Sequence, residues 1–212
     1  HLLEGYDFWF AGILPEDHCA RILDFGCGTG IGSLILSKET SNEIIGIDRD
    51  PSIIQFTKQL YTPSNLTFTV GDISTLKDFQ KFDIVIVSEV LEHNTDHRNI
   101  IKAVEKVSQK RGEIFISVPN WKWGGMDKNS DHKADWTLKK VLSEFSYRSN
   151  VRFFVISHRQ NQSEIAYTIS QQISKDAEQF LILYSKPKRK SKFCVQKPSL
   201  ERILLIAHDA YP

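Results

Sequence analysis

Acidic and imidazole side chains follow two of the apolar runs in this sequence, and their types suit proton transfer or metal binding. Glu89, Glu92 and His93 come soon after the apolar run of residues 82–87, and His132 lies beyond the next such run. A carboxylate or an imidazole can take the proton of a hydroxyl group. Two carboxylates and two imidazoles can also surround Mg²⁺ or Mn²⁺ and leave positions open for oxygen ligands. We therefore predict that these four residues are catalytic, as bases or as metal ligands.

A second group of residues has the types and spacing of a ligand-binding turn. An apolar run ends at Asp24, and Gly26, Gly28 and Gly30 follow at alternate positions before a helix-like segment. Asp48 ends the next apolar run, about twenty residues after Gly28, which is the spacing at which an acid can bind a ribose diol. The third glycine comes one residue too early for a dinucleotide fingerprint, and Asp24 would repel a pyrophosphate. A ligand with a ribose, an adenine and an amino-acid tail fits this pattern better.

The remaining pattern indicates the elements that must position these groups. Apolar runs alternate with helical periodicity, which is typical of an α/β doubly wound parallel sheet. In such sheets ligands bind beyond the carboxyl ends of the strands, where both groups fall. Residues 157–175 are polar and poorly patterned, and no strand or helix is predicted there. The predicted strands are residues 22–25, 44–47, 66–70, 82–87, 112–118, 151–156 and 179–184, and the predicted helices are residues 6–14, 31–37, 51–61, 99–109 and 137–145.

The glycine turn resembles motif I of the class I S-adenosylmethionine-dependent methyltransferases. The resemblance implies a seven-stranded sheet in the order 3-2-1-4-5-7-6, with the last strand antiparallel. It implies that Asp24 meets the ammonium group of S-adenosylmethionine, Asp48 its ribose and Asp72 its adenine, while Ile73 packs on the ring. The glycines form the turn under the methionine part. Arg49 and Ser88 complete the predicted cofactor-binding set.

The acceptor is less clearly indicated than the cofactor. The segment from Glu89 to His93, the Pro119-Asn120 pair and the later His132 resemble methyltransferases of surface-polysaccharide gene clusters, which implies O-methylation of a glycan or glycoconjugate by a metal-free base. The Glu-x-x-Glu-His pattern with a later histidine also resembles metal-dependent 2′-O-methyltransferases of small-RNA 3′ ends. Quinone-biosynthesis O-methyltransferases share its first part. The remaining alternatives are solvated acids beside a structural histidine, and a cofactor-binding module without transfer activity.

Composition and charge limit the possible domain organisation of the chain. The chain has 212 residues with a net charge of +1, and no apolar run is long enough to span a membrane. Three cysteines without metal-ligand spacing indicate reduced thiols in a cytoplasmic protein. We predict a methyltransferase domain at residues 1–185 and a basic linker at 186–199. Residues 200–212 resemble the first strand of a glycosyltransferase domain, which would be a fused partner. Apart from the linker the chain is acidic, which disfavours nucleic acid as a partner.

Overall fold

A computed structural model describes residues 20–120, 131–148, 150–161, 164–170 and 179–185. Several predicted features lie outside these residues: the helix at residues 6–14, the basic linker at 186–199 and the strand at 200–212. None of the helices in the described part of the chain is both long enough and apolar enough to cross a membrane.

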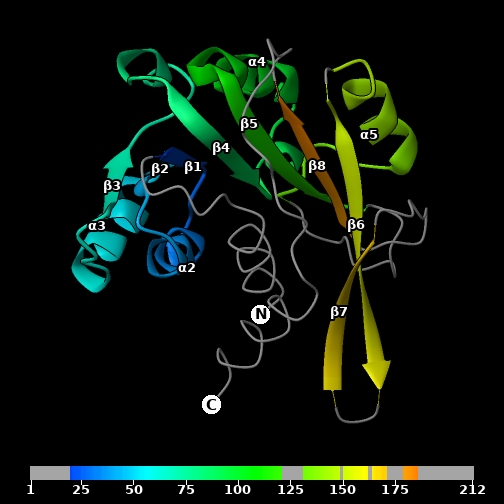
Figure 1. Cartoon of the computed structure of the whole chain (residues 1–212), viewed down its shortest axis with the longest axis horizontal. Helices are drawn as coiled ribbons and strands as arrows, with labels where there is room; N and C mark the ends of the chain where they lie inside the picture. The colour runs from blue at the N-terminus through cyan, green and yellow to red at the C-terminus, as the bar shows by residue number, and fades with distance from the viewer. Residues whose placement is uncertain (1–19, 121–130, 149, 162–163, 171–178, 186–212) are drawn as a thin grey trace.

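The described strands form one mixed sheet in the order β3-β2-β1-β4-β5-β8-β6-β7 (Figure 1). Strands β3, β2, β1, β4 and β5 are parallel, and β8 runs antiparallel to both β5 and β6. The predicted order 3-2-1-4-5-7-6 is therefore confirmed, with β8 as the seventh strand. The strands are β1 (Arg21–Phe25), β2 (Glu43–Asp48), β3 (Leu66–Val70), β4 (Phe82–Ser88), β5 (Ser108–Pro119), β6 (Arg152–Asn161), β7 (Glu164–Ser170) and β8 (Gln179–Ser185).

Strand β7 is an addition that the sequence reading left unassigned. It pairs with the second half of β6 as an antiparallel hairpin at the edge of the sheet. The hairpin sequence has no long apolar run, and only the short alternation of Ile165, Tyr167 and Ile169 indicates β7. The prediction ended β6 at residue 156, whereas the strand continues to Asn161.

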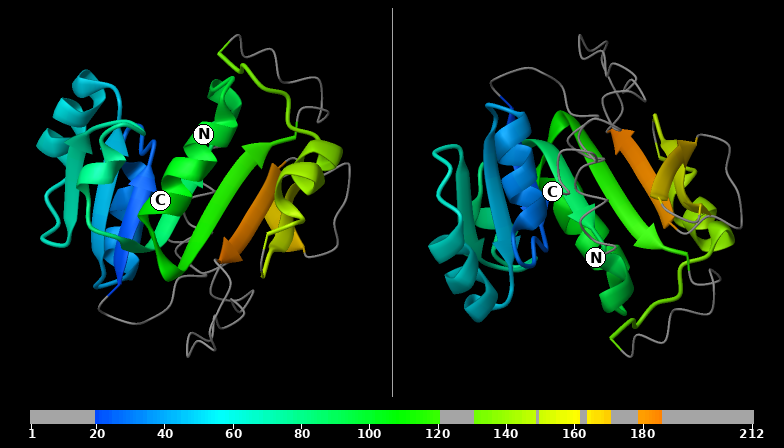
Figure 2. Two further views of the ribbon diagram at one scale, coloured as in Figure 1. Left: turned by 90° about the horizontal axis from the view of Figure 1, so that it is seen from above. Right: turned by 90° about the horizontal axis from the view of Figure 1, so that it is seen from below.

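Helices cover both faces of the sheet (Figure 2). On one face, α2 (Ile31–Glu39) and α3 (Pro51–Leu60) bury Leu36 and Ile54 against apolar residues of β1, β2 and β3. On the other face, α4 (His97–Val107), α5 (Leu138–Phe145) and the 3₁₀ turn η1 (Leu76–Asp78) pack on β1, β4, β5 and β8. Burial of these two apolar layers is the main stabilising contribution to the fold.

Side-chain caps fix where the helices begin. The Asp50 carboxylate accepts a hydrogen bond from Ser52 N at 2.8 Å and starts α3, as predicted. Asp96 caps α4, so this helix spans residues 97–107 rather than 99–109. Because α4 ends at Val107, β5 begins at once and is longer than the predicted 112–118, with a register irregularity opposite Phe82 and Ile84.

Candidate active site

The glycine turn connects β1 to α2 at the carboxyl edge of the sheet. Gly26, Gly28 and Gly30 have φ values of 79°, 51° and 77°, a region that side chains with a Cβ avoid. A Cβ at Gly26 would lie 2.5 Å from Val90 Cγ2, and one at Gly30 would lie 2.7 Å from Phe68 Cζ. A Cβ at Gly28 would meet no atom of the described residues within 4 Å. The outer glycines are therefore required by packing, whereas Gly28 borders open space in front of the turn.

Asp24 lies beneath this turn with only 6% of its surface exposed. Its Oδ2 accepts a hydrogen bond from Ser33 Oγ at 2.5 Å. Burial raises the pKa of the Asp24 carboxyl to about 6, against the lowering effect of the Ser33 hydroxyl and with a further contribution from the charge of Asp48. A cation placed beside Asp24 would stabilise its charged form.

Asp48 ends β2 and is held against the turn by backbone groups. Its Oδ2 accepts from Gly28 N at 3.0 Å, and its Oδ1 accepts from Asp50 N at 3.0 Å. Each carboxylate oxygen retains a second lone pair for a hydroxyl donor. The spacing between Gly28 and Asp48 thus corresponds to a direct contact between the two residues.

The other predicted cofactor residues lie at the ends of neighbouring strands. Asp72 follows β3, and its exposed carboxylate accepts from Ser74 N and Ser74 Oγ, which lower its pKa. Ile73 beside it exposes 39% of its surface, which is unusual for an isoleucine. Arg49 is exposed after β2. Ser88 ends β4, and its hydroxyl contacts Ser117 Oγ on β5 at 3.0 Å.

Glu89 occupies a strained position directly after β4. Its φ of 52° is in the left-handed region, where a residue other than glycine carries strain. Ser117 Oγ donates to Glu89 Oε1 at 2.8 Å, and Gln179 and Glu92 also form side-chain hydrogen bonds with this carboxyl group. Burial raises the pKa of Glu89 to about 7, although these hydrogen bonds and the charge of His132 oppose the shift.

Glu92, His93 and His132 form a compact group beside Glu89. Each offers a ligand atom, and these atoms lie within 4.8 Å of one another. Glu92 is 1% exposed, and His93 Nε2 lies 3.9 Å from Glu92 Oε1. The two imidazole rings meet edge to face with their centroids 4.8 Å apart. The structure thus brings together the four residues that were predicted to be catalytic.

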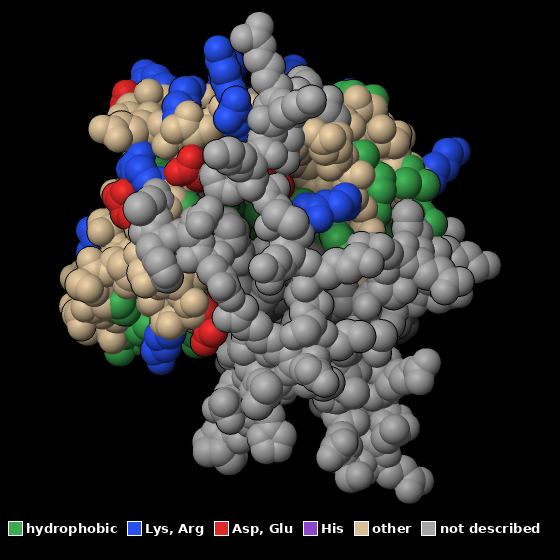
Figure 3. Space-filling model, in the orientation of Figure 1, with side chains coloured by type: hydrophobic (Ala, Val, Ile, Leu, Met, Phe, Trp, Pro, Cys, Tyr) green, Lys and Arg blue, Asp and Glu red, His purple; other side chains and the backbone are tan. Residues whose placement is uncertain are grey.

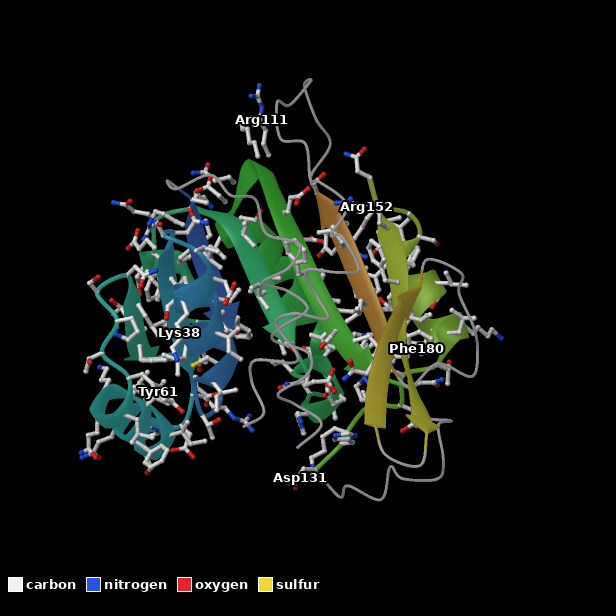
Figure 4. The ribbon with its side chains drawn as sticks, turned by 60° about the horizontal axis from the view of Figure 1, so that its bottom comes forward. Lys38, Tyr61, Arg111, Asp131, Arg152 and Phe180 are labelled. Atoms are coloured by element: carbon white, nitrogen blue, oxygen red, sulfur yellow. The ribbon has the colours of Figure 1, made fainter. Side chains whose placement is uncertain are left out.

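Main-chain contacts bring His132 to this group from the segment after β5. Lys133 N and Ala134 N both donate to the Glu92 carbonyl, at 2.6 and 3.0 Å. The carbonyl of Asp131 lies 3.3 Å from His93 Nδ1. Figure 4 labels Asp131 at the edge of the sheet where β4 and β5 end. The 3₁₀ turn η2 (Leu91–His93) and the loop therefore form one unit.

Two residues of this site were absent from the sequence reading. Ser117 is fully buried within an otherwise apolar stretch of β5, and Gln179 is 2% exposed at the start of β8. Gln179 pairs with Pro119 across the antiparallel ladder, which places its amide beside Glu89. The signal for Ser117 is a polar residue inside an apolar run. Gln179 carries no comparable signal, because its place depends on the pairing of β8 with β5.

Comparison with known proteins identifies relatives of this architecture. A family model described as "Methyltransferase domain" matches residues 16–182. The ubiquinone biosynthesis O-methyltransferase of Coxiella burnetii is 34% identical over 103 residues, which are 47% of this chain and 44% of that protein. The protein of the same name from Bartonella quintana is 30% identical over 126 residues, 56% of this chain and 50% of that one. The chain thus spans about half the length of these curated relatives.

Solved structures share the fold. A SAM-dependent methyltransferase from Archaeoglobus fulgidus superposes with a TM-score of 0.64 at 20% identity, covering 87% of this chain and 93% of that one. The methyltransferase domain of bacterial CtHen1-C gives a TM-score of 0.62 at 20% identity, with 87% and 98% covered. The chain therefore shares the fold of these methyltransferases.

Proposed function

The chain belongs to the methyltransferase domain family, and from that premise we propose that the protein transfers the methyl group of S-adenosylmethionine to a hydroxyl oxygen. The observation that carries the proposal is that two groups share one edge of the sheet: the glycine turn with its acids, and the cluster of Glu89, Glu92, His93 and His132. The sulfonium of the cofactor supplies an activated methyl group with its own leaving group. The residues of the chain must bind the cofactor, align the acceptor and remove its proton.

The fit of this edge of the sheet to the cofactor rests on four features. The space in front of Gly28 admits the methionine part, and the buried carboxylate of Asp24 would gain a cationic partner in its ammonium group. Asp48 retains lone pairs for the two ribose hydroxyls. At the end of β3, Asp72 would accept from the adenine amino group while the exposed side chain of Ile73 packs on the ring.

His93 and His132 are the proposed bases. When His93 Nδ1 carries the proton and donates to the Asp131 carbonyl, Nε2 is the nitrogen that can accept a proton from a hydroxyl group. Nε2 lies 3.9 Å from Glu92 Oε1, so the carboxylate would stabilise the imidazolium that forms. Glu89 and Glu92 orient the imidazoles in this mechanism.

A divalent cation is a second form of the same proposal. The ligand atoms of Glu92, His93 and His132 are close enough to bind one ion, and Glu89 adjoins them. Carboxylate and imidazole ligands suit Mn²⁺, and carboxylates suit Mg²⁺. Such an ion would lower the pKa of an acceptor hydroxyl.

The acceptor that we propose is a hydroxyl of a glycan or glycoconjugate, supported by the sequence resemblance around Glu89, Pro119 and His132. A fused glycosyltransferase domain after residue 200 belongs to the same proposal. A quinone-type phenol is the second candidate, because the curated relatives are named ubiquinone biosynthesis O-methyltransferases. The third candidate acceptor is the terminal ribose of an RNA, and only the Glu-x-x-Glu-His pattern supports it.

Calorimetry and an acceptor panel test the proposal. S-adenosylhomocysteine should bind the wild-type protein and a His93→Ala, His132→Ala variant equally, because neither histidine belongs to the glycine turn. Mn²⁺ is then titrated into the complex, with Glu92→Ala, His132→Ala as the control. Formation of S-adenosylhomocysteine from S-adenosylmethionine is measured with an oligosaccharide, an alkylated catechol and an RNA oligonucleotide. A protein that binds neither cofactor form would overturn the proposal.

A further inference from the structure

The connection from β3 to β4 places no long helix beside α4. The β1–β2, β2–β3 and β4–β5 connections each contain a helix of nine to eleven residues. The β3–β4 connection at residues 71–81 contains only the three-residue turn η1. In the view from above in Figure 2, this connection lies beside α4 over the same face of the sheet.

A cavity of about 710 Å³ lies between η1 and α4, which we call the lysine groove. Four lysines line it: Lys77 and Lys81 from the connection, and Lys102 and Lys106 from α4. No Asp or Glu belongs to its lining, and no ion pair joins the four lysines to an acid within the described ranges. Lys and Arg side chains gather along the upper left edge in Figure 3, near this connection.

The positive charges of the lysine groove lie close to one another. Lys102 and Lys106 are one turn apart on α4, and like charges at this spacing destabilise a helix. The ammonium group of Lys81 is held at the C-terminal end of α4, where it donates to the Lys106 carbonyl. A negatively charged partner would relieve the repulsion between these lysines.

Between the lysines the groove is apolar. Leu76, Phe79 and Ala103 form its floor, and Phe79 and Ala103 are only partly buried. The Phe79 ring also packs toward Phe82, with centroids 6.1 Å apart. A flat membrane surface would not enter a concave cavity. The shape and chemistry therefore favour a partner with an apolar face and acidic flanks.

We propose that the lysine groove binds an acidic amphipathic helix of a partner protein. The helix would lay its apolar stripe on the floor and place Glu or Asp side chains against the lysines on both sides. The helix would occupy the place that the short β3–β4 connection leaves open.

A designed peptide tests this proposal by fluorescence anisotropy. The probe is a 16-residue helix with leucine on one face and glutamate on both flanks, and its control has lysine in place of glutamate. We expect the glutamate peptide alone to bind, and Lys102→Glu, Lys106→Glu to weaken binding at least tenfold. The matched control, Lys38→Glu, Lys58→Glu on α2 and α3, alters exposed lysines of the opposite face and should bind normally. Ala103→Trp fills the floor without changing charge and should also block binding.

Thermal unfolding shows whether each variant is folded. Absence of binding, or equal loss in both charge-reversed variants, would overturn the proposal. Single-stranded oligouridylate is titrated in the same assay. If it binds more tightly than the glutamate peptide, and Lys102→Glu, Lys106→Glu abolishes this binding, the groove would be assigned to a phosphodiester chain instead. The affinity of that complex should fall steeply with salt concentration.

Discussion

Replacing Asp24 with Asn should move stability and cofactor affinity in opposite directions. The native state retains the Asp24 proton up to about pH 6, whereas the unfolded chain releases it near 3.8. The native state therefore binds more protons between these values, and the free energy of unfolding falls as the pH rises through that window. A difference of about 2 pKa units corresponds to about 3 kcal/mol, which the wild-type protein has lost above pH 6.

Asparagine cannot ionise, and its carbonyl oxygen can still accept from Ser33 Oγ. At pH 7.5 we expect Asp24→Asn to raise the free energy of unfolding by about 2–3 kcal/mol, measured by urea denaturation without ligand. Near pH 4 the variant and the wild type should be similar. The same variant should bind S-adenosylhomocysteine about 10- to 100-fold more weakly, because a charge-assisted hydrogen bond to the ammonium group is lost.

Ser33→Ala is the matched control. It removes the hydrogen bond but keeps the carboxylate, so it should lower the stability at pH 7.5 rather than raise it. If Asp24→Asn were less stable than the wild type at pH 7.5, the reasoning from burial would be wrong. Unchanged affinity for S-adenosylhomocysteine would refute the placement of the ammonium group.

Three further predictions concern the same edge of the sheet. Asp48→Ala should weaken cofactor binding by about 1–3 kcal/mol in calorimetry, and unchanged affinity would contradict the ribose assignment. Gly30→Ala should lower the melting temperature more than Gly28→Ala, because a Cβ at residue 30 would clash with the Phe68 ring. A Cβ at residue 28 meets no described atom, so Gly28→Ala should chiefly reduce cofactor affinity. His93→Ala, His132→Ala should reduce methyl transfer at least 100-fold while S-adenosylhomocysteine affinity stays within twofold, and full activity would exclude both bases.

Local sequence signals predicted the cofactor side of the fold well. The glycines, the apolar strand ends and the Asp50-Pro51 helix start are each encoded within a few residues. The spacing from Gly28 to Asp48 predicted their proximity because parallel strands bring their carboxyl ends to one edge, and the 3.0 Å hydrogen bond places them together. The alternation of apolar runs and helices predicted a doubly wound sheet, and the order of its seven strands came from the resemblance.

The features that escaped prediction depend on contacts between distant segments. Gln179 reaches Glu89 only because β8 runs antiparallel beside β5. The β6–β7 hairpin is a local exception, because its second strand is marked only by the short alternation of Ile165, Tyr167 and Ile169. The lysine groove arises from a helix that the β3–β4 connection lacks, and its lysines are far apart in the sequence.

The junction between η2 and the His132 loop is made by main-chain atoms. The Glu92 carbonyl accepts from Lys133 N and Ala134 N, and neither of these two contacts involves the side chain at residue 92. Replacing Glu92 with Gln or Ala should thus remove a carboxylate from the cluster while these two main-chain hydrogen bonds remain. Main-chain atoms thus contribute to the assembly of the site, while its side chains determine its chemistry. We therefore expect that substitutions at residue 92 alter proton transfer or metal binding at the site while the main-chain junction is retained.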